Sequence, residues 1–168
     1  MENFEYISAI GQDSHRFLVG DSMNKPLILG GVHIPGMPGF DANSDGDVIL
    51  HALTNAVSGI TGRNILGPIA DALCMEELVT DSREYLKLAL EDLHRNGDME
   101  ISHLSLSLEC LRPKLLEHIP SIKSSLGQML GIEPSKVGLT ATTGEGLTDF
   151  GRGMGVQALC ILTVRKSL

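Results

Sequence analysis

The segment Gly11-Gln12-Asp13-Ser14-His15-Arg16-Phe17 has the alternation of a β-strand. In a strand Asp13 and His15 point to the same face, because successive side chains alternate between faces. Farther along, His51 lies in a segment with helical periodicity and could supply a third ligand from outside the strand. One carboxylate and two imidazoles on rigid elements, with a fourth position open, form the ligand set of a catalytic zinc ion. The three residues therefore predict a metal site, although an isolated Asp-x-His also arises by chance.

Composition limits the classes of protein to which the chain can belong. Its 168 residues fit a single domain, residues 1–168, and aromatic residues make up only 4%, so the core must be aliphatic. A formal net charge of −8 argues against a general nucleic-acid or membrane-surface binder. The first residues contain neither a basic segment nor a long apolar run, so we expect no secretory signal and no transmembrane span. Three widely spaced cysteines indicate reduced thiols and a cytoplasmic location.

Hydrophobic periodicity predicts alternating strands and helices along the chain. Strands are expected over residues 5–17, 27–34, 101–109, 136–143 and 156–164. Helices are expected over residues 44–60, 69–77, 81–96 and 112–131. The first two strands are predicted to form a hairpin through a turn at residues 21–26, with a bulge at Gly30 and Gly31. The last strand is apolar on both faces, which predicts a central place in the sheet or burial against a partner chain.

This order of elements predicts an α+β fold. The expected architecture is a mixed, mainly antiparallel four-stranded sheet with helices packed on one face. A helix kink or restart is expected at Pro120, because proline cannot donate a backbone hydrogen bond.

The helix that carries His51 begins after the polar segment Ser44-Asp45-Gly46-Asp47. This pattern predicts Ser44 as the N-cap and Asp47 as its acidic partner. His51 lies one turn beyond Asp47, which would either bond a partly buried histidine or orient that histidine as a metal ligand. The free amides at Asn43 and Ser44 could also bind an anion.

A second polar concentration is Thr142-Thr143-Gly144-Glu145. Glycine lets backbone amides face a phosphate and threonine hydroxyls can donate to its oxygens, while one carboxylate is enough to hold a phosphate-bound magnesium ion. The alternative is an ordinary glycine-rich turn with solvated polar groups. The poorly periodic residues 61–80 have the length of a substrate lid.

Taken together, these segments resemble the 2-C-methyl-D-erythritol 2,4-cyclodiphosphate synthase family of the non-mevalonate isoprenoid pathway. The resemblance covers nearly the whole chain, with the same element order and spacing. It rests on the following motifs: Asp13-Ser14-His15, Ser44-Asp45-Gly46-Asp47-Val48, His51-Ala52-Leu53-Thr54, Pro113-Lys114, His118-Ile119-Pro120, Ala141-Thr142-Thr143 with Glu145, and Gly151-Arg152-Gly153.

The resemblance implies a cytoplasmic homotrimer with active sites between neighbouring subunits, acting on a small molecule and not on nucleic acid or membranes. The implied reaction is an intramolecular attack of a 2-phosphate on the β-phosphorus of a CDP-linked substrate, which expels CMP and closes a cyclic diphosphate. Asp13, His15 and His51 match the zinc ligands, and Glu145 matches the residue facing Mg²⁺ or Mn²⁺. Asn43 and Thr143 match the residues that stabilise the transition state.

The resemblance also implies the residues that bind the substrate. Its phosphates and sugar are expected at Asp13, Ser14, His15, Asn43, Ser44, Thr142, Thr143, Gly144, Glu145 and Arg152. Cytidine is expected at Cys110, Leu111, Arg112, Pro113 and Lys114, largely through backbone atoms.

The chain departs from the family pattern around the substrate. The family usually has histidine at the position of Asn43, aspartate at Asn55 and glutamate at Met154. Asn43 can donate a neutral hydrogen bond but cannot carry a proton, and Asp71 is the acid that could replace those of the usual lid. Two alternatives therefore stay open. One is a non-catalytic trimer that binds a metal and a diphosphate, with Arg152 as anchor, and the other is a zinc-dependent phosphate-ester hydrolase.

Overall fold

The computed structural model describes residues 3–20, 25–97 and 99–168. The strands are β1 (Phe4–Arg16), β2 (Pro26–Leu29), β3 (Val32–Pro38), β4 (Met99–Glu109), β5 (Val137–Thr142) and β6 (Gly155–Ser167). The helices are α1 (Val48–Thr61), α2 (Pro68–Glu76), α3 (Ser82–Arg95) and α4 (Ile119–Leu130), with short 3-10 turns at Pro134–Lys136 and Gly144–Gly146. None of these helices is long and apolar enough to cross a membrane.

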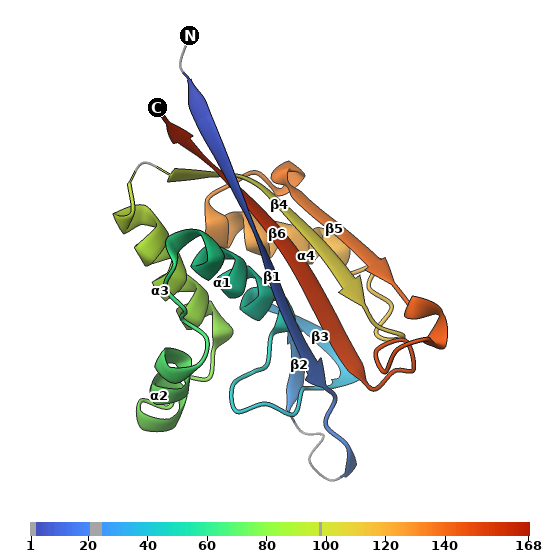
Figure 1. The fold of residues 1–168 in the computed structure, drawn as a ribbon. Helices are drawn as coiled ribbons and strands as arrows, with labels where there is room; N and C mark the ends of the chain where they lie inside the picture. Colours follow the sequence, from blue (N-terminus) through green and yellow to red (C-terminus); the bar gives the residue numbers. More distant parts are fainter. Residues whose placement is uncertain (1–2, 21–24, 98) are drawn as a thin grey trace.

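The main sheet has four strands in the order β1-β6-β4-β5 (Figure 1). The β1/β6 and β6/β4 pairs are antiparallel, and the β4/β5 pair is parallel. The predicted mixed, mainly antiparallel four-stranded sheet is therefore confirmed. The last strand lies between two neighbours, as its apolar sequence predicted.

The predicted hairpin between residues 5–17 and 27–34 is wrong. β1 pairs with β6 along its whole length, from Phe4 opposite Ser167 to Arg16 opposite Gly155. The second predicted strand is instead divided at Gly30 and Gly31 into β2 and β3, which form a separate two-stranded sheet. Both glycines have positive φ, 59° and 74°, as a tight hairpin turn requires of its two central residues. The two glycines therefore form the hairpin turn and are not a bulge. A turn was also predicted at residues 21–26, but residues 21–24 lie outside the described residues.

The two faces of the main sheet differ in what covers them. Leu104, Leu106 and Leu108 of β4 are buried on the face that carries the helices, as their alternation predicted. On the opposite face, Tyr6 and Ile10 of β1 are 63% and 67% exposed. α1 and α4 contact the sheet and lie against its buried face (Figure 1).

Gly11 determines how closely α1 lies against β1. A Cβ atom at this position would collide with the carbonyl oxygen of Ala52 and approach the amide nitrogen of Ala56. Only glycine leaves room for the helix backbone to rest on the strand. Because Asp13 and His15 follow Gly11 on the same face, this contact brings the first turn of α1 to both side chains.

The N-cap of α1 is Asp47, and the predicted N-cap at Ser44 is wrong. The Asp47 carboxylate accepts hydrogen bonds from the amides of Ile49 and Leu50 in the helix. It also accepts from the amides of Gly30 and Gly31, at 2.9 and 2.7 Å, and so ties the β2/β3 hairpin to the start of the helix. Aspartate is a preferred N-cap because its oxygens satisfy amides that have no partner within the helix.

The other predicted helices agree with α2 and α3, but α4 is shorter than predicted. It begins at Ile119 and not at Arg112, with Pro120 in its first turn. Proline is favoured there because the first amides of a helix have no acceptor within it, and its ring restricts the residue before it. Pro120 therefore starts this helix and does not kink it.

Candidate metal centre and active site

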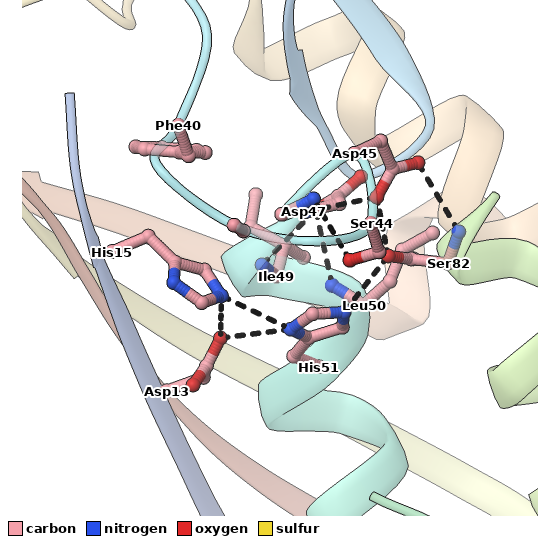
Figure 2. A network of polar contacts seen from close by, with 12 residues as sticks. Asp13, His15, Phe40, Ser44, Asp45, Asp47, Ile49, Leu50, His51 and Ser82 are labelled. Atoms are coloured by element: carbon pink, nitrogen blue, oxygen red, sulfur yellow. Dashed lines mark hydrogen bonds and ion pairs between the residues drawn. The ribbon is translucent and has the colours of Figure 1, made fainter. Parts of the chain in front are cut away.

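Asp13, His15 and His51 bring three ligand atoms together, as the sequence predicted (Figure 2). The Nδ1 atom of His51 lies 3.0 Å from Asp13 Oδ2 and 3.3 Å from His15 Nε2. His15 Nε2 lies 3.1 Å from the same carboxylate oxygen. In a tetrahedral zinc site with bonds of about 2.0 Å, neighbouring ligand atoms are about 3.3 Å apart. The three atoms thus have the spacing and the chemistry of a zinc site.

The three side chains reach this point for local reasons. Asp13 and His15 sit opposite Ala158 and Val156 of β6, on the face of β1 that packs against α1. His51 is in the first turn of α1 and is 8% exposed. The His15 ring also contacts Phe40, with ring centroids 5.8 Å apart. Because the Asp13 and His15 side chains stay 22% and 23% exposed, a ligand can approach from the open side.

Asp13 is held in its ionised form. Burial acts to raise the pKa of its carboxyl, but hydrogen bonds and charge interactions with His15 and His51 outweigh burial and lower the pKa to about 2. An ionised carboxylate is the form that coordinates a metal ion.

The second ring nitrogen of His51 does not meet Asp47, contrary to the expectation from spacing. His51 Nε2 lies 2.8 Å from the hydroxyl of Ser82, the first residue of α3. Ser82 in turn donates to Asp45, through its hydroxyl and through its backbone amide. The Asp47 carboxylate is occupied by backbone amides instead. Sequence reasoning recognised Asp81-Ser82 only as a helix start and missed this role, because nothing local links residue 82 to residue 51.

The candidate metal site opens into a cleft of about 490 Å³. The cleft is lined by Asp13, His15, Asp41, Ala42, Asn43, Ser44, His51, Asn55, Leu66, Gly67, Ala70, Asp71, Cys74 and Tyr85. Asn43, Ser44 and Asp71 were predicted from sequence to act on the substrate or its lid, and they border the same cleft as the metal ligands. Cys74 and Tyr85 were not predicted.

The loop that carries Asn43 is held by Lys25. The ammonium group donates hydrogen bonds to the carbonyl oxygens of Phe40, Ala42 and Ser44. All three ammonium hydrogens can be used in this way. The loop is therefore fixed on both sides of Asn43.

Four of the five residues predicted to bind cytidine, together with Thr142 and Thr143, line a second, smaller pocket of about 160 Å³. It is lined by Cys110, Leu111, Pro113, Lys114, Leu115, Ala141, Thr142 and Thr143. This pocket lies at the ends of β4 and β5, whereas the metal ligands lie on β1 and α1. β1 and β5 are the opposite edges of the sheet, about 14 Å apart at the usual strand spacing. Within one chain, the structure does not bring the two groups of predicted residues into one pocket.

Five other predicted residues line neither pocket: Ser14, Arg112, Gly144, Glu145 and Arg152. Ser14 is exposed on the opposite face of β1 from Asp13. Glu145 is exposed in the 3-10 turn after β5, with φ of 52°. Arg152 forms an ion pair with Asp149 at 2.8 Å and donates to the carbonyl of Gly146.

The fold and site define a class of protein: a small α+β domain with a candidate Asp-His-His metal site that lines an open cleft. The model of the YgbB family matches residues 6–165, and the chain belongs to this family.

Named relatives are similar over nearly their whole length. The chain is 50% identical to the 2-C-methyl-D-erythritol 2,4-cyclodiphosphate synthase of Chlamydia abortus over 161 residues, which cover 96% of this chain and 90% of that protein. It is 47% identical, over 96% of this chain and 89% of the relative, to the protein of the same name from Chlamydia trachomatis serovar A.

Solved structures of proteins with this name, or of which this enzyme forms a part, have a similar fold. A structure of 2C-methyl-D-erythritol-2,4-cyclodiphosphate synthase matches 94% of this chain and 99% of its own with a TM-score of 0.77 and 32% identity. Another, described as the bound form with CDP, covers the same shares with a TM-score of 0.76 and 30% identity. The bifunctional IspDF of Campylobacter jejuni matches 97% of this chain with a TM-score of 0.86 and 30% identity, and this chain spans 43% of that longer protein.

Proposed function

We propose that this protein is a 2-C-methyl-D-erythritol 2,4-cyclodiphosphate synthase, a CMP-releasing lyase of isoprenoid precursor biosynthesis. Its substrate is 4-diphosphocytidyl-2-C-methyl-D-erythritol 2-phosphate. The observation that carries this proposal is the Asp13-His15-His51 cluster, found in a chain about half identical to proteins of that name. Three free cysteines, two of them buried, support the cytoplasmic location that forms part of the proposal.

The reaction forms one bond and breaks one. An oxygen of the 2-phosphate bonds to the β-phosphorus, and the bond from that phosphorus to the bridging oxygen breaks, so that CMP leaves with the bridging oxygen. No external nucleophile is needed. The protein therefore has to hold the attacking oxygen and the leaving group in line and offset the developing charge.

Residues of the chain divide this work. Asp13, His15 and His51 would hold zinc, and Glu145 would face magnesium or manganese on the phosphates. When bound, these ions supply Lewis-acid charge and a template for the phosphates. Asn43 lies on the loop fixed by Lys25, and its side-chain amide donates a hydrogen bond to a phosphate oxygen of the substrate. Thr143 donates its hydroxyl to the phosphates, beside the cytidine-binding segment of residues 110–114.

A homotrimer would complete the active site. The metal cleft and the pocket containing Thr143 lie at opposite edges of one sheet, so a neighbouring copy has to supply the second pocket. The sheet also has a face that none of the described helices covers, on which Tyr6, Ile10 and Ile161 are exposed. Exposed apolar patches of this kind mark contact surfaces between proteins. The proposed trimer buries this face and places each metal cleft beside a partner's cytidine segment.

The test is release of CMP from the named substrate in the presence of zinc and magnesium, with His51→Ala as the matched variant. We expect the wild type to form CMP and a cyclic product in equal amounts. His51→Ala should lose zinc and activity yet keep its helical signal in circular dichroism, because the apolar stripe of α1 is buried independently of the metal.

Other outcomes would redirect the assignment. Stoichiometric zinc without CMP would favour the non-catalytic metal and diphosphate binder, consistent with Asn43, Asn55 and Met154 in place of the usual acids and histidine. A linear phosphate product, with water incorporated, would favour the hydrolase.

A further inference from the structure

Both ring nitrogens of His51 have a polar partner (Figure 2). Its Nδ1 atom faces Asp13 Oδ2 at 3.0 Å, and its Nε2 atom faces the Ser82 hydroxyl at 2.8 Å. The two contacts come from different elements, β1 and α3, and the ring itself is supplied by α1. This arrangement fixes the plane of the imidazole as well as its position.

Only one neutral form of this ring can bind a metal at the site. A neutral imidazole carries one hydrogen, and the nitrogen without it donates the lone pair. Because Nδ1 faces the other two ligand atoms, the hydrogen has to be on Nε2. The Asp13 carboxylate works against this form when no metal is bound, because a carboxylate 3.0 Å away attracts a hydrogen to Nδ1.

Ser82 and Asp45 oppose that attraction from the other side of the ring. The Ser82 hydroxyl donates its hydrogen to Asp45 Oδ1, and this leaves the oxygen lone pairs of Ser82 facing His51 Nε2. The Ser82 backbone amide donates to the second carboxylate oxygen of Asp45 at 3.1 Å. Ser82 is fully buried, so water does not compete for these contacts. The chain Asp45–Ser82–His51 thus offers Nε2 an acceptor and no donor.

We propose that Ser82 and Asp45 are positioning residues of the metal centre, which hold His51 with its hydrogen on Nε2 and its Nδ1 lone pair toward the metal. The inference rests on the metal site of the proposed function but not on the reaction that the site catalyses. Residues that orient a metal-bound histidine typically contribute 10- to 100-fold to metal affinity.

The test measures zinc affinity of the full-length protein by competition with a chromophoric chelator. Ser82→Ala should raise the zinc dissociation constant about 10- to 100-fold, because Nε2 loses its acceptor. Ser82→Thr keeps the hydroxyl and should restore most of that affinity. The matched control is Ser58→Ala, which removes another buried serine hydroxyl of the protein, bonded to the Ile65 amide and not to a histidine. We expect the control to bind zinc like the wild type.

A second measurement separates positioning from a merely structural role. In the zinc-loaded protein the hydrogen on His51 Nε2 should exchange slowly with solvent in ¹⁵N-histidine NMR spectra, and Ser82→Ala should make it exchange quickly. Wild-type zinc affinity or unchanged exchange in Ser82→Ala would overturn the proposal, as would an equal loss of affinity in Ser58→Ala.

Asp45→Asn decides the question if Ser82→Ala does not fold. It keeps one oxygen to accept from the Ser82 hydroxyl but replaces the second carboxylate oxygen, which accepts from the Ser82 amide, with a donor, and it removes the charge. Zinc binding should therefore weaken in the same direction; wild-type affinity would overturn the proposal. Zinc affinity is independent of CMP release, so failure here and failure of the proposed function are distinguishable.

Discussion

Asn43 stands at a position where the family resemblance predicts a histidine, and unlike histidine it cannot carry a proton. It borders the metal cleft from a loop whose carbonyls are held by Lys25, so its amide is presented on a fixed backbone. An amide can donate a hydrogen bond to a phosphate oxygen without transferring a proton, and this is sufficient where the reaction needs charge stabilisation only.

We expect Asn43→Ala to lower kcat for CMP release about 100-fold, the typical cost of removing one donor aimed at developing charge. The matched control is Asn55→Ala. Asn55 borders the same cleft, but its amide already donates to the backbone of Gln12 at 3.1 Å, so its loss should change kcat less. Equal effects of the two substitutions on kcat would contradict a specific role for Asn43.

At the scale of single elements, the contact between α1 and β1 determines whether the ligands meet. Gly11 is the point of closest approach, where a methyl group would meet the backbone of α1. Backbone cannot move aside as a flexible side chain can, so the helix has to shift away from the strand.

Gly11→Ala should therefore lower the free energy of unfolding by about 1–3 kcal/mol, as overpacking does, and weaken zinc binding because His51 moves with the helix. Chemical denaturation and zinc titration check the two effects. In the control Gly138→Ala of β5, the new methyl would meet only atoms at 3.7 Å or farther, so stability and zinc binding should change little. Wild-type zinc affinity in Gly11→Ala would show that this contact does not position His51.

Asp47, the N-cap of α1, makes the stability of the protein depend on pH. Burial raises the pKa of the carboxyl from 3.8 to about 6, although the amides of Gly31 and Gly30 oppose the rise. Between these two values the folded state holds a proton that the unfolded state has released. The contribution of Asp47 to stability is thus fully present below pH 3.8 and is lost as the pH rises through about 6.

A difference of one pKa unit between the folded and unfolded states corresponds to about 1.36 kcal/mol. The contribution of Asp47 to the free energy of unfolding therefore changes by about 3 kcal/mol in total. We expect the free energy of unfolding of the wild type, relative to Asp47→Asn, to fall by about this amount between pH 4 and pH 7. Denaturation in the presence of a chelator, at fixed protein concentration, measures it. A difference that rises with pH would mean that the backbone amides outweigh burial and that Asp47 is ionised throughout.

At the scale of the whole molecule, the open face of the sheet is the feature that the single chain leaves unexplained. Ile10 and Ile161 are directly opposite each other on β1 and β6 and are 67% and 49% exposed. Two isoleucines paired on an exposed sheet face are the observation that supports the proposed trimer.

Ile10→Lys should convert the proposed trimer into smaller species, because a buried interface does not accommodate an unpaired charge. Light scattering after size-exclusion chromatography gives the mass. The control Leu78→Lys places the same charge on another exposed apolar residue, 80% exposed in the connection between α2 and α3, and should leave the mass unchanged. If Ile10→Lys loses CMP release together with the trimer but still binds zinc, the active site needs the partner's pocket. A wild-type mass for Ile10→Lys would contradict burial of this face.

Much of the fold and the site could be predicted because both leave a local pattern. Alternation identified β4, and helical periodicity identified α1 and α3, since each pattern depends on residues close in sequence. The candidate metal cluster could be predicted because Asp13 and His15 share a strand face and His51 carries a familiar ligand type. Local reasoning failed where more than one nearby residue suits the same role. It predicted Ser44 as the N-cap of α1, which is Asp47, and residue 112 as the start of α4, which is residue 119.

The sequence by itself determined the α+β class, the periodic elements and the types of metal ligand, because these follow from the spacing of side chains along the backbone. Only the tertiary structure decided that β1 pairs with β6 at the other end of the chain, since that choice depends on which apolar faces bury each other. It alone placed Ser82 and Asp45 behind His51, and it alone separated the metal cleft from the pocket of Thr143 by the width of the sheet. Contacts between residues far apart in sequence have no local pattern, because they arise only once the packed elements bring those residues together.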